Sequence, residues 1–293
     1  MMDMPYCPRC GAEVSEDALY CSKCGHALKE KRGKLTVEEL DIPFPKAENP
    51  ELEISSGVAG YIIVEPGYEK FVEGTIEYDV PAWKPEITQT ENIVSIKQQE
   101  KFTRNVWDAP KNDWKIKLGK KKPYQLRMKT GVSRGLWKLG SLPITSLNIE
   151  TGVSQTKLEF DEPNMEVMEL LRLQTGVGET SLTGLLNANF RQMRLDAGIG
   201  QVNLSYTGKG LERDANVRLE GGIGGLDIKI RKDLPAVFEV SGLSSVSHRG
   251  NIHRTSGGFG NAIYTTSTYD LGEKPVLSFK IGLGIGGISL TEV

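Results

Sequence analysis

Hydrophobic residues recur along most of this chain in one pattern, in which apolar positions alternate with variable ones before a small residue, a glycine and a valine or isoleucine. Successive copies read LNIETGV, LRLQTGV, MRLDAGI and VRLEGGI. Their glycines, with matching ones before and after, are Gly57, Gly131, Gly152, Gly176, Gly198, Gly222 and Gly284. From Gly131 to Gly222 the copies are 21, 24, 22 and 24 residues apart. A period of about twenty residues is typical of a solenoid built from stacked repeats.

Within each copy, apolar side chains stand five and three residues before the glycine, and one and six residues after it. The copy at Gly176 has Leu171, Leu173, Val177 and Leu182 at these positions. Spacings of two predict strands, whereas a helix would need apolar residues three and four positions apart. We therefore expect two short strands bent around each glycine, with all four apolar positions on one buried face.

The glycine has two possible explanations, and the sequence leaves both open. Either the backbone at the bend requires a positive φ angle, or the corner is too crowded for a side chain. The residues just before it are also small: Thr130, Thr151, Thr175, Ala197 and Gly221. Because one bent pair of strands cannot bury its own apolar face, the copies must stack, about 4.8 Å apart. The sequence thus predicts an all-β fold, a β-solenoid or rack of stacked, hairpin-like rungs.

The overall composition agrees with such a fold and narrows the function. The chain has 293 residues, of which 38% are hydrophobic and 33 are glycine, and the repeat uses the excess glycine. A formal net charge of −2 argues against a general polyanion-binding protein. No apolar run predicts a membrane-spanning helix, and the first residues lack the pattern of an export signal. We therefore expect a cytoplasmic protein without a membrane span.

A second pattern, CPRCG followed by CSKCG, contains all four cysteines: Cys7, Cys10, Cys21 and Cys24. Two residues between the cysteines of a pair let both sulfur atoms face one ion, so the two pairs predict a tetrahedral four-thiolate site for a structural Zn²⁺. The segment is too short to build a hydrophobic core. Metal binding would therefore supply most of its folding free energy. The sequence predicts a small zinc ribbon ahead of the solenoid.

Two disulfides or a redox dithiol are the alternatives to zinc. Disulfides need an oxidising compartment, and a redox motif normally has one such pair beside a βαβ unit. His26 follows the second pair, but four thiols already complete the site. The basic residues nearby could contact DNA or RNA. However, Tyr6 and Tyr20 are the only aromatic residues there, which disfavours nucleic acid and favours a module that contacts proteins.

The order of these motifs resembles the bacterial toast-rack proteins, a group found among cell-envelope stress proteins and proteins described as "putative adhesins". The resemblance is carried by LEISSGVAGYIIV, FVEGTIEYDVPAWKPEI, NIVSIKQQ, NDWKIKL and the glycine copies through FKIGLGIGGISL, roughly four fifths of the chain. Relatives in this group often carry a zinc ribbon followed by membrane helices. The resemblance implies a non-catalytic toast-rack domain that presents a surface for assembly.

The chain is expected to divide into three parts. Residues 1–28 form the zinc ribbon, residues 29–50 a charged linker with three prolines, and residues 51–293 the toast-rack β-solenoid domain. Residues 244–275 interrupt the repeat and are expected to form an inserted loop. The last rung ends at Val293 without a predicted cap. We therefore expect an open sheet end there, which would bind a protein partner or a second copy of the chain.

The columns of residues that successive rungs place side by side predict no catalytic site. Four positions before the glycines the residues are mostly basic, such as Arg172 and Arg218, and two positions before they are partly acidic, such as Asp196 and Glu220. We interpret these columns as a ladder of salt bridges, with a basic stripe for phosphate or an anionic polymer as the alternative. We expect no column to place carboxylates on neighbouring rungs, as glycoside hydrolysis would need.

These patterns favour a non-catalytic scaffold or interaction protein, which the resemblance links to cell-envelope stress. One alternative is a carbohydrate-binding or carbohydrate-active β-helix protein with its site in the insertion, where His248 and His253 have Asp270 and Glu273 as the nearby carboxylates. Loop histidines are more often solvated than catalytic, so this alternative comes second. A nucleic-acid-binding regulator acting through the zinc ribbon is the third hypothesis.

Overall fold

The computed structural model describes residues 6–15, 18, 20–25, 34–98, 111–242, 244–258 and 260–293. All 16 strands of this part belong to one sheet. The helical elements among the described residues are short: η1 (Pro81–Trp83), η2 (Leu185–Ala188) and α1 (Ser267–Asp270). No helix of this part is long and apolar enough to cross a membrane. The fold is thus all-β, as the repeat pattern predicts.

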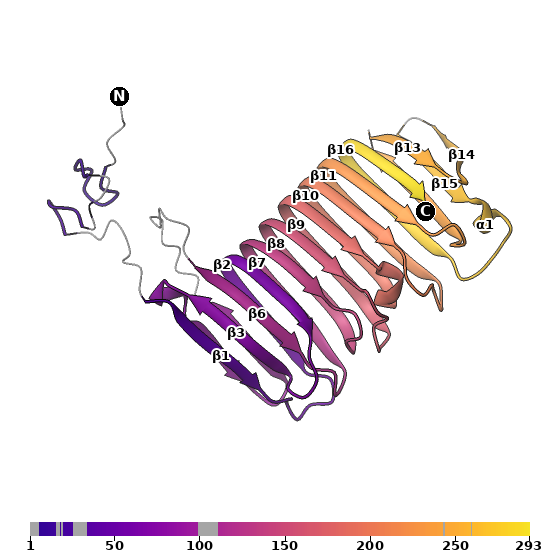
Figure 1. Ribbon diagram of the computed structural model, residues 1–293. Coiled ribbons are helices and arrows are strands. Elements are labelled where there is room, and N and C mark those ends of the chain that lie inside the picture. Colours follow the sequence, from indigo (N-terminus) through magenta and orange to yellow (C-terminus); the bar gives the residue numbers. More distant parts are fainter. Residues whose placement is uncertain are drawn as a thin grey trace.

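Seven long strands stack side by side and form the body of the rack (Figure 1). They are β2 (Glu51–Pro66), β7 (Tyr124–Lys138), β8 (Ile144–Glu159), β9 (Met168–Thr183), β10 (Phe190–Tyr206), β11 (Ala215–Ile230) and β16 (Leu277–Glu292). Each pairs in parallel with the next in this order. The expected pair of short strands is therefore one bent strand, and the stacked-rung prediction is confirmed.

The repeat glycines lie in single file along one corner of the rack, because the strand register places Thr151 opposite Thr175 and Val153 opposite Val177. A Cβ atom added to Gly176 would lie 2.5 Å from the carbonyl oxygen of Gly152 on the neighbouring rung. The glycines of this file are absent from those with positive φ angles. From Gly131 onward, crowding between rungs is therefore the reason for these glycines, and the backbone angle is not.

A second file of glycines lies two residues further along the rungs, and the sequence pattern did not single it out. It consists of Gly178, Gly200, Gly224 and Gly286, whose φ angles lie between 142° and 153°. A Cβ atom on each would lie 1.8 Å from a backbone carbonyl oxygen of the previous rung. These positions thus combine a backbone conformation that favours glycine with a contact that excludes any side chain.

The bend also changes which side chains face the core. On β9, Leu171 and Leu173 are buried before the corner, and Thr180 and Leu182 are buried after it. The bend contains one residue more than the regular alternation of inward and outward side chains allows. On β9 the inward positions are therefore odd-numbered before the bend and even-numbered after it. As a result Val177 points outward and is 48% exposed. The expectation that the residue after each glycine is buried is therefore wrong.

The N-terminal end of the rack is closed by a split rung and three further strands. β5 (Ile93–Gln98) covers the first part of β2, and β6 (Asn112–Leu118) covers its second part. Antiparallel strands extend this end: β4 (Pro85–Gln89) on β5, β3 (Val72–Tyr78) on β6 and β1 (Thr36–Ile42) on β3. β1 lies within the expected linker 29–50. It is a strand because Leu40 and Ile42 bury their side chains in the core.

The C-terminal end repeats this construction. β12 (Ala236–Gly242) and β13 (Ser245–Arg249) form a split rung that covers β16. β15 (Asn261–Thr266) pairs antiparallel with β12, and β14 (Ile252–Gly258) pairs with β15. Residues 244–275 are therefore not an inserted loop but mostly strands that cap the rack. The rung that ends at Val293 lies between β11 and the split rung, so the expected open end at that rung is wrong.

Candidate functional sites

The four cysteines come from two turns of the same shape. In the first turn the backbone N–H of Gly11 donates to the carbonyl of Cys7 at 2.8 Å, and in the second Gly25 donates to Cys21 at 2.9 Å. Both glycines have a φ angle of +68°, which disfavours other residues. The two CxxCG motifs thus fold into matching knuckles, and the glycine after each pair makes the turn possible. His26 lies outside the described residues.

The two knuckles bring all four thiols together. The sulfur atoms of Cys7 and Cys24 are 3.7 Å apart, those of Cys10 and Cys21 are 3.6 Å apart, and all four lie within 4.8 Å of one another. A tetrahedral ion with metal–sulfur bonds of about 2.3 Å requires sulfur–sulfur distances of about 3.8 Å. The predicted ligand set therefore fits one zinc ion. Among the described residues, no other cluster of three or more His, Cys, Asp and Glu side chains brings its ligand atoms together in this way.

The surroundings of Cys21 favour its thiolate. Burial by itself raises the pKa of this thiol, but hydrogen bonds from the backbone of Cys24 and Lys23 and from the thiols of Cys10 and Cys24 outweigh that effect. Together they lower the pKa of Cys21 to about 7. Because a thiolate is the form that ligates metal, this sulfur is suited to bind zinc near neutral pH.

On the rack, the basic column predicted from the sequence is continuous across four rungs. The register places Arg172, Arg194, Arg218 and Lys280 next to one another. Three of them have carboxylate partners: Arg172 lies 3.8 Å from Asp196, Arg218 Nε donates to Glu220 at 2.9 Å, and Lys280 lies 3.9 Å from Glu239. The column therefore forms a salt-bridge ladder over part of its length, as predicted.

One expectation about the acidic column is wrong. Asp196 and Glu220 are direct register partners on β10 and β11, so neighbouring rungs do stack carboxylates. Each of these carboxylates nevertheless has its own arginine, Arg172 for Asp196 and Arg218 for Glu220. They act as counter-ions that reduce the repulsion between stacked cations. A related arrangement holds at β2, where a hydrogen bond from Lys97 lowers the pKa of Glu53.

These ion pairs should contribute little to stability. The side chains of Arg218 and Glu220 are 65% and 51% exposed, so water screens their attraction. We expect Arg218→Gln to change the free energy of unfolding by no more than about 0.5 kcal/mol, measured by urea denaturation. A loss of several times that amount would show that the ladder helps hold the rungs together.

A row of exposed apolar side chains follows the glycine file from β7 to β16, and we call it the corner ridge. It consists of Val132, Val153, Val177, Ile199, Ile223 and Ile285, which are between 47% and 66% exposed. The register places each of them beside the next. Sequence reasoning found these positions but assigned them to the core, because it could not foresee the change of phase at the bend.

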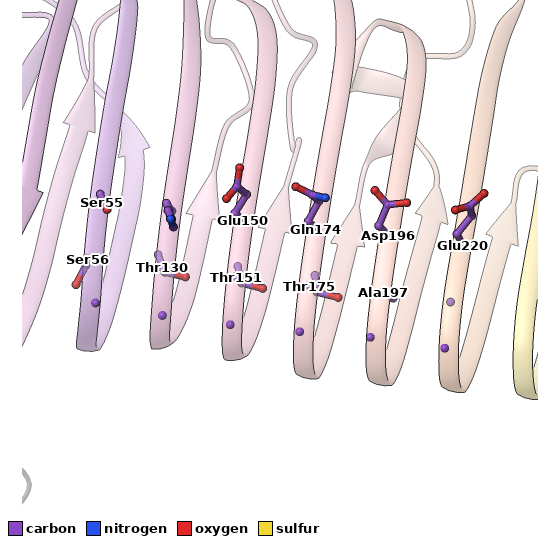
Figure 2. A pocket seen from close by; sticks show the side chains of 18 of the residues that line it. Ser55, Ser56, Thr130, Glu150, Thr151, Gln174, Thr175, Asp196, Ala197 and Glu220 are labelled. Carbon is purple, nitrogen blue, oxygen red and sulfur yellow. The ribbon is translucent and has the colours of Figure 1, made fainter. Parts of the chain in front are cut away.

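A groove runs along each side of the corner ridge. The glycine groove, of ≈ 1030 Å³, has the glycine file as its floor and Lys129, Glu150, Gln174, Asp196 and Glu220 along its wall. Figure 2 shows four of these side chains, Glu150 to Glu220, standing in a row on successive rungs above the bend. The serine groove, of ≈ 510 Å³, has Ser133, Ser154 and Gly178 as its floor and Tyr61, Arg134, Gln155 and Glu179 along its wall.

Residues 244–275, which were expected to form an inserted loop, contain two histidines. They lie on different strands, His248 on β13 and His253 on β14. His253 Nε2 is 2.8 Å from a carboxylate oxygen of Asp270, and the two side chains are 48% and 39% exposed. The ring of His248 packs against that of Tyr264. Asp270 thus pairs with one of the two histidines, and the pair lies on an exposed surface outside both grooves.

Comparison with known proteins adds family assignments. Residues 6–28 match the zinc-ribbon domain family. No curated protein matches this chain. A solved structure from Clostridium sporogenes, described as a "putative cell adhesion protein", is 19% identical with a TM-score of 0.47, covering 89% of this chain and 99% of that one. A "putative adhesin" from Bacteroides fragilis is 14% identical with a TM-score of 0.46, covering 88% and 97%.

The remaining match concerns the rack itself. Residues 29–183 match the family described as the N-terminal domain of toast_rack, DUF2154. The matched segment contains strands β1 to β9, in which the glycine file and the corner ridge begin. It makes up more than half of the 293 residues. This chain therefore belongs to the toast-rack family and carries a match to the zinc-ribbon domain ahead of its rack.

Proposed function

We propose that this protein is a non-catalytic scaffold and interaction protein, in which the rack and the ribbon both act as docking surfaces for protein partners. The ribbon would be folded around one structural Zn²⁺ held by Cys7, Cys10, Cys21 and Cys24. The observation that carries the proposal is the corner ridge, a continuous row of half-exposed valine and isoleucine side chains. Soluble proteins seldom expose such a continuous apolar surface unless something binds there.

The charged residues of the rack support a role without catalysis. A hydrolytic carboxylate pair needs one group free to act as acid and another as base or nucleophile. Here Asp196 and Glu220 instead serve as counter-ions of Arg172 and Arg218. The pair of His253 and Asp270 lies apart from both grooves. These arrangements suit a surface that binds a protein without catalysis. They support the proposed interaction protein over a carbohydrate-active enzyme.

The proposal also includes a place of action. We place the protein in the cytoplasm, a reducing compartment in which cysteine thiols stay free to bind metal. The family resemblance supports a role in the response to cell-envelope stress. In that role, the chain would link a protein bound by the ribbon to a protein bound by the corner ridge of the rack.

The test is a purification of the tagged full-length protein from its native cells, compared with Cys21→Ser and with Ser22→Ala as the matched control. We expect a defined protein partner to copurify with the wild type and with Ser22→Ala in a fixed ratio, and to be lost with Cys21→Ser. Nuclease treatment before purification should leave the complex intact. Equal recovery with Cys21→Ser, or a complex that depends on nucleic acid, would contradict the proposed role of the ribbon.

A further inference from the structure

We infer that copies of this chain associate head to tail, so that β13 at the C-terminal end of one rack pairs with β1 at the N-terminal end of the next. Figure 1 shows these two strands at opposite ends of the rack. The inference goes beyond the proposed function, because it concerns neither the ribbon nor the corner ridge. It also differs from the sequence-based expectation of association at the rung that ends at Val293, since that rung lies inside the stack.

Both strands have one edge that no other described strand covers. β1 pairs only with β3, and β13 pairs only with β16. An uncovered edge presents backbone N–H and C=O groups that can pair with a strand of another molecule. Two further strands lie at sheet edges, but β4 begins with Pro85 and β14 contains a β-bulge between Arg254 and Ser256. Proline and bulges protect an edge from pairing, and β1 and β13 have neither.

The two edges lie on the same face of the rack and run in the same direction. β13 covers the part of β16 that follows the bend, and β1 is connected through β3 and β6 to the corresponding part of β2. β13 is parallel to β16. Because β1 is antiparallel to β3, and β3 is antiparallel to β6, β1 is parallel to the rungs as well. A pair between β13 and β1 of the next copy would therefore be parallel, like the pairs between rungs, and would continue the sheet.

The register of the sheet determines which residues of the two strands stand at the same level. Followed from strand to strand, the position of Arg249 on β13 leads to that of Asp41 on β1. It passes through Thr291, Lys229, Glu159, Lys138, Lys117 and Glu73. In a next copy that continues this register, Arg249 faces Asp41 and Ser247 faces Glu39. No residue of β13 then meets a like charge.

The charges at the two ends favour this order. β1 contains three carboxylates and no cation, at Glu38, Glu39 and Asp41. β13 contains Arg249 and no carboxylate. Among the described residues, no ion pair involves Arg249 or Glu39, and Asp41 lies 2.8 Å from Lys70 with its side chain 70% exposed. Two β1 edges, or two β13 edges, would set like charges against each other, whereas β13 against β1 brings opposite charges together.

The two ends also have matching steps. On the face of β1, the N-terminal end has three strands beyond β2, and the C-terminal end has one strand beyond β16. On the opposite face the numbers are two and three. The higher side of each end therefore meets the lower side of the other. The totals differ by one strand, and a spacing of about 4.8 Å across sheets about 10 Å apart corresponds to a tilt of about 25° between copies. Head-to-tail contacts of this kind repeat along a row of copies.

Sedimentation velocity of the zinc-loaded full-length protein tests the inference. We expect species larger than a dimer, whose mass rises with protein concentration from the 32.3 kDa of one chain. Arg249→Glu and Asp41→Lys, each alone, should raise the dissociation constant at least about tenfold, because each sets like charges against each other at the contact. Lys229→Glu is the matched control. It makes the same change of charge at the same level on β11, inside the stack, and should leave association unchanged.

Mixing the two variants tests which ends meet. The altered end of Arg249→Glu fits the altered end of Asp41→Lys, and their unaltered ends fit each other. An equimolar mixture should therefore associate nearly as well as the wild type, although neither variant does so alone. Urea denaturation of each variant separates lost association from lost folding.

Four results would overturn the inference. The first is a monomer at every concentration, and the second is a closed dimer without larger species. The third is association that Arg249→Glu and Asp41→Lys weaken no more than Lys229→Glu does. The fourth is a mixture of the two variants that associates no better than each variant alone.

Discussion

Replacing Gly200 by alanine is expected to lower the free energy of unfolding of the rack by about 2 to 5 kcal/mol. Gly200 has a φ angle of +145°, a conformation that alanine rarely adopts. Its new Cβ atom would also lie 1.8 Å from the carbonyl oxygen of Gly178 on β9. The strain and the clash cannot both be relieved without moving β10 away from β9, which would break the ladder of hydrogen bonds between them.

The matched control is Gly57→Ala. Gly57 stands at the first position of the glycine file, where an added Cβ atom would meet nothing within 4 Å, and its φ angle is not positive. This change should be neutral or should stabilise the rack by up to about 1 kcal/mol, because alanine restricts the unfolded chain. Gly176→Ala should fall between the two, with a clash but no strained φ angle. Urea denaturation followed by circular dichroism provides the free energies.

The comparison separates two roles of glycine in one protein. Equal destabilisation at Gly57 and Gly200 would mean that the cost comes from replacing any corner glycine, and not from the neighbouring rung. An unchanged stability of Gly200→Ala would mean that β9 and β10 are not as close at this corner as the structure shows.

Loss of zinc is expected to unfold the ribbon and to leave the rack folded. Segment 6–25 is too short for a hydrophobic core, and its buried side chains are mainly the thiols of Cys7 and Cys21. In small metal-folded domains of this kind, zinc binding supplies about 10 to 16 kcal/mol near neutral pH. Cys21→Ser removes one of four ligands. We therefore expect a large loss of zinc affinity together with loss of the ordered ribbon.

Zinc content measured by elemental analysis should be one ion per chain for the wild type and for the control Ser22→Ala, and far less for Cys21→Ser. In NMR spectra, the amide proton resonances of the ribbon should move to the narrow range of chemical shifts of an unfolded chain when a chelator is added. The urea midpoint of the rack should stay constant throughout. Full zinc occupancy in Cys21→Ser would show that the four thiols are not the ligand set. A shifted rack midpoint would show that the rack depends on the ribbon.

The zinc ribbon illustrates how far sequence reasoning reaches when a site is local. Within each pair, two residues separate the ligands, so the chain itself fixes the distance between Cys7 and Cys10 and between Cys21 and Cys24. The glycine that follows each pair supplies the backbone angle of the turn. The structure brings the predicted four thiols together.

The corner ridge illustrates where the same reasoning fails. Val177 is two positions from Thr175 and four from Leu173, and strict alternation therefore assigns it to the core. The bend at Gly176 contains one additional residue. Side chains that alternation alone would place inward therefore point outward beyond the bend. Nothing in the sequence of one rung marks this shift, because an inward and an outward valine look the same.

The two ends of the rack were beyond sequence reasoning for a related reason. β12 and β13 form one rung in two pieces, and β16 follows them in the chain but lies beneath them in the stack. Strand order depends on which pairing of strands buries the most apolar surface. The strands that pair here lie more than thirty residues apart in the chain. Phe238 on β12 and Phe279 on β16 are an example, since their ring centroids are 4.5 Å apart and the rings stack.

The sequence by itself determined the repeat, the all-β stacked architecture, the glycine at each corner and the cluster of four thiols, because each follows from residues close together in the chain. Only the tertiary structure decided the phase of the side chains beyond the bend, the second glycine file, the order of the terminal strands and the exposure of the corner ridge. These depend on how one rung lies against the next, and contacts between rungs are set by the packing of the whole stack.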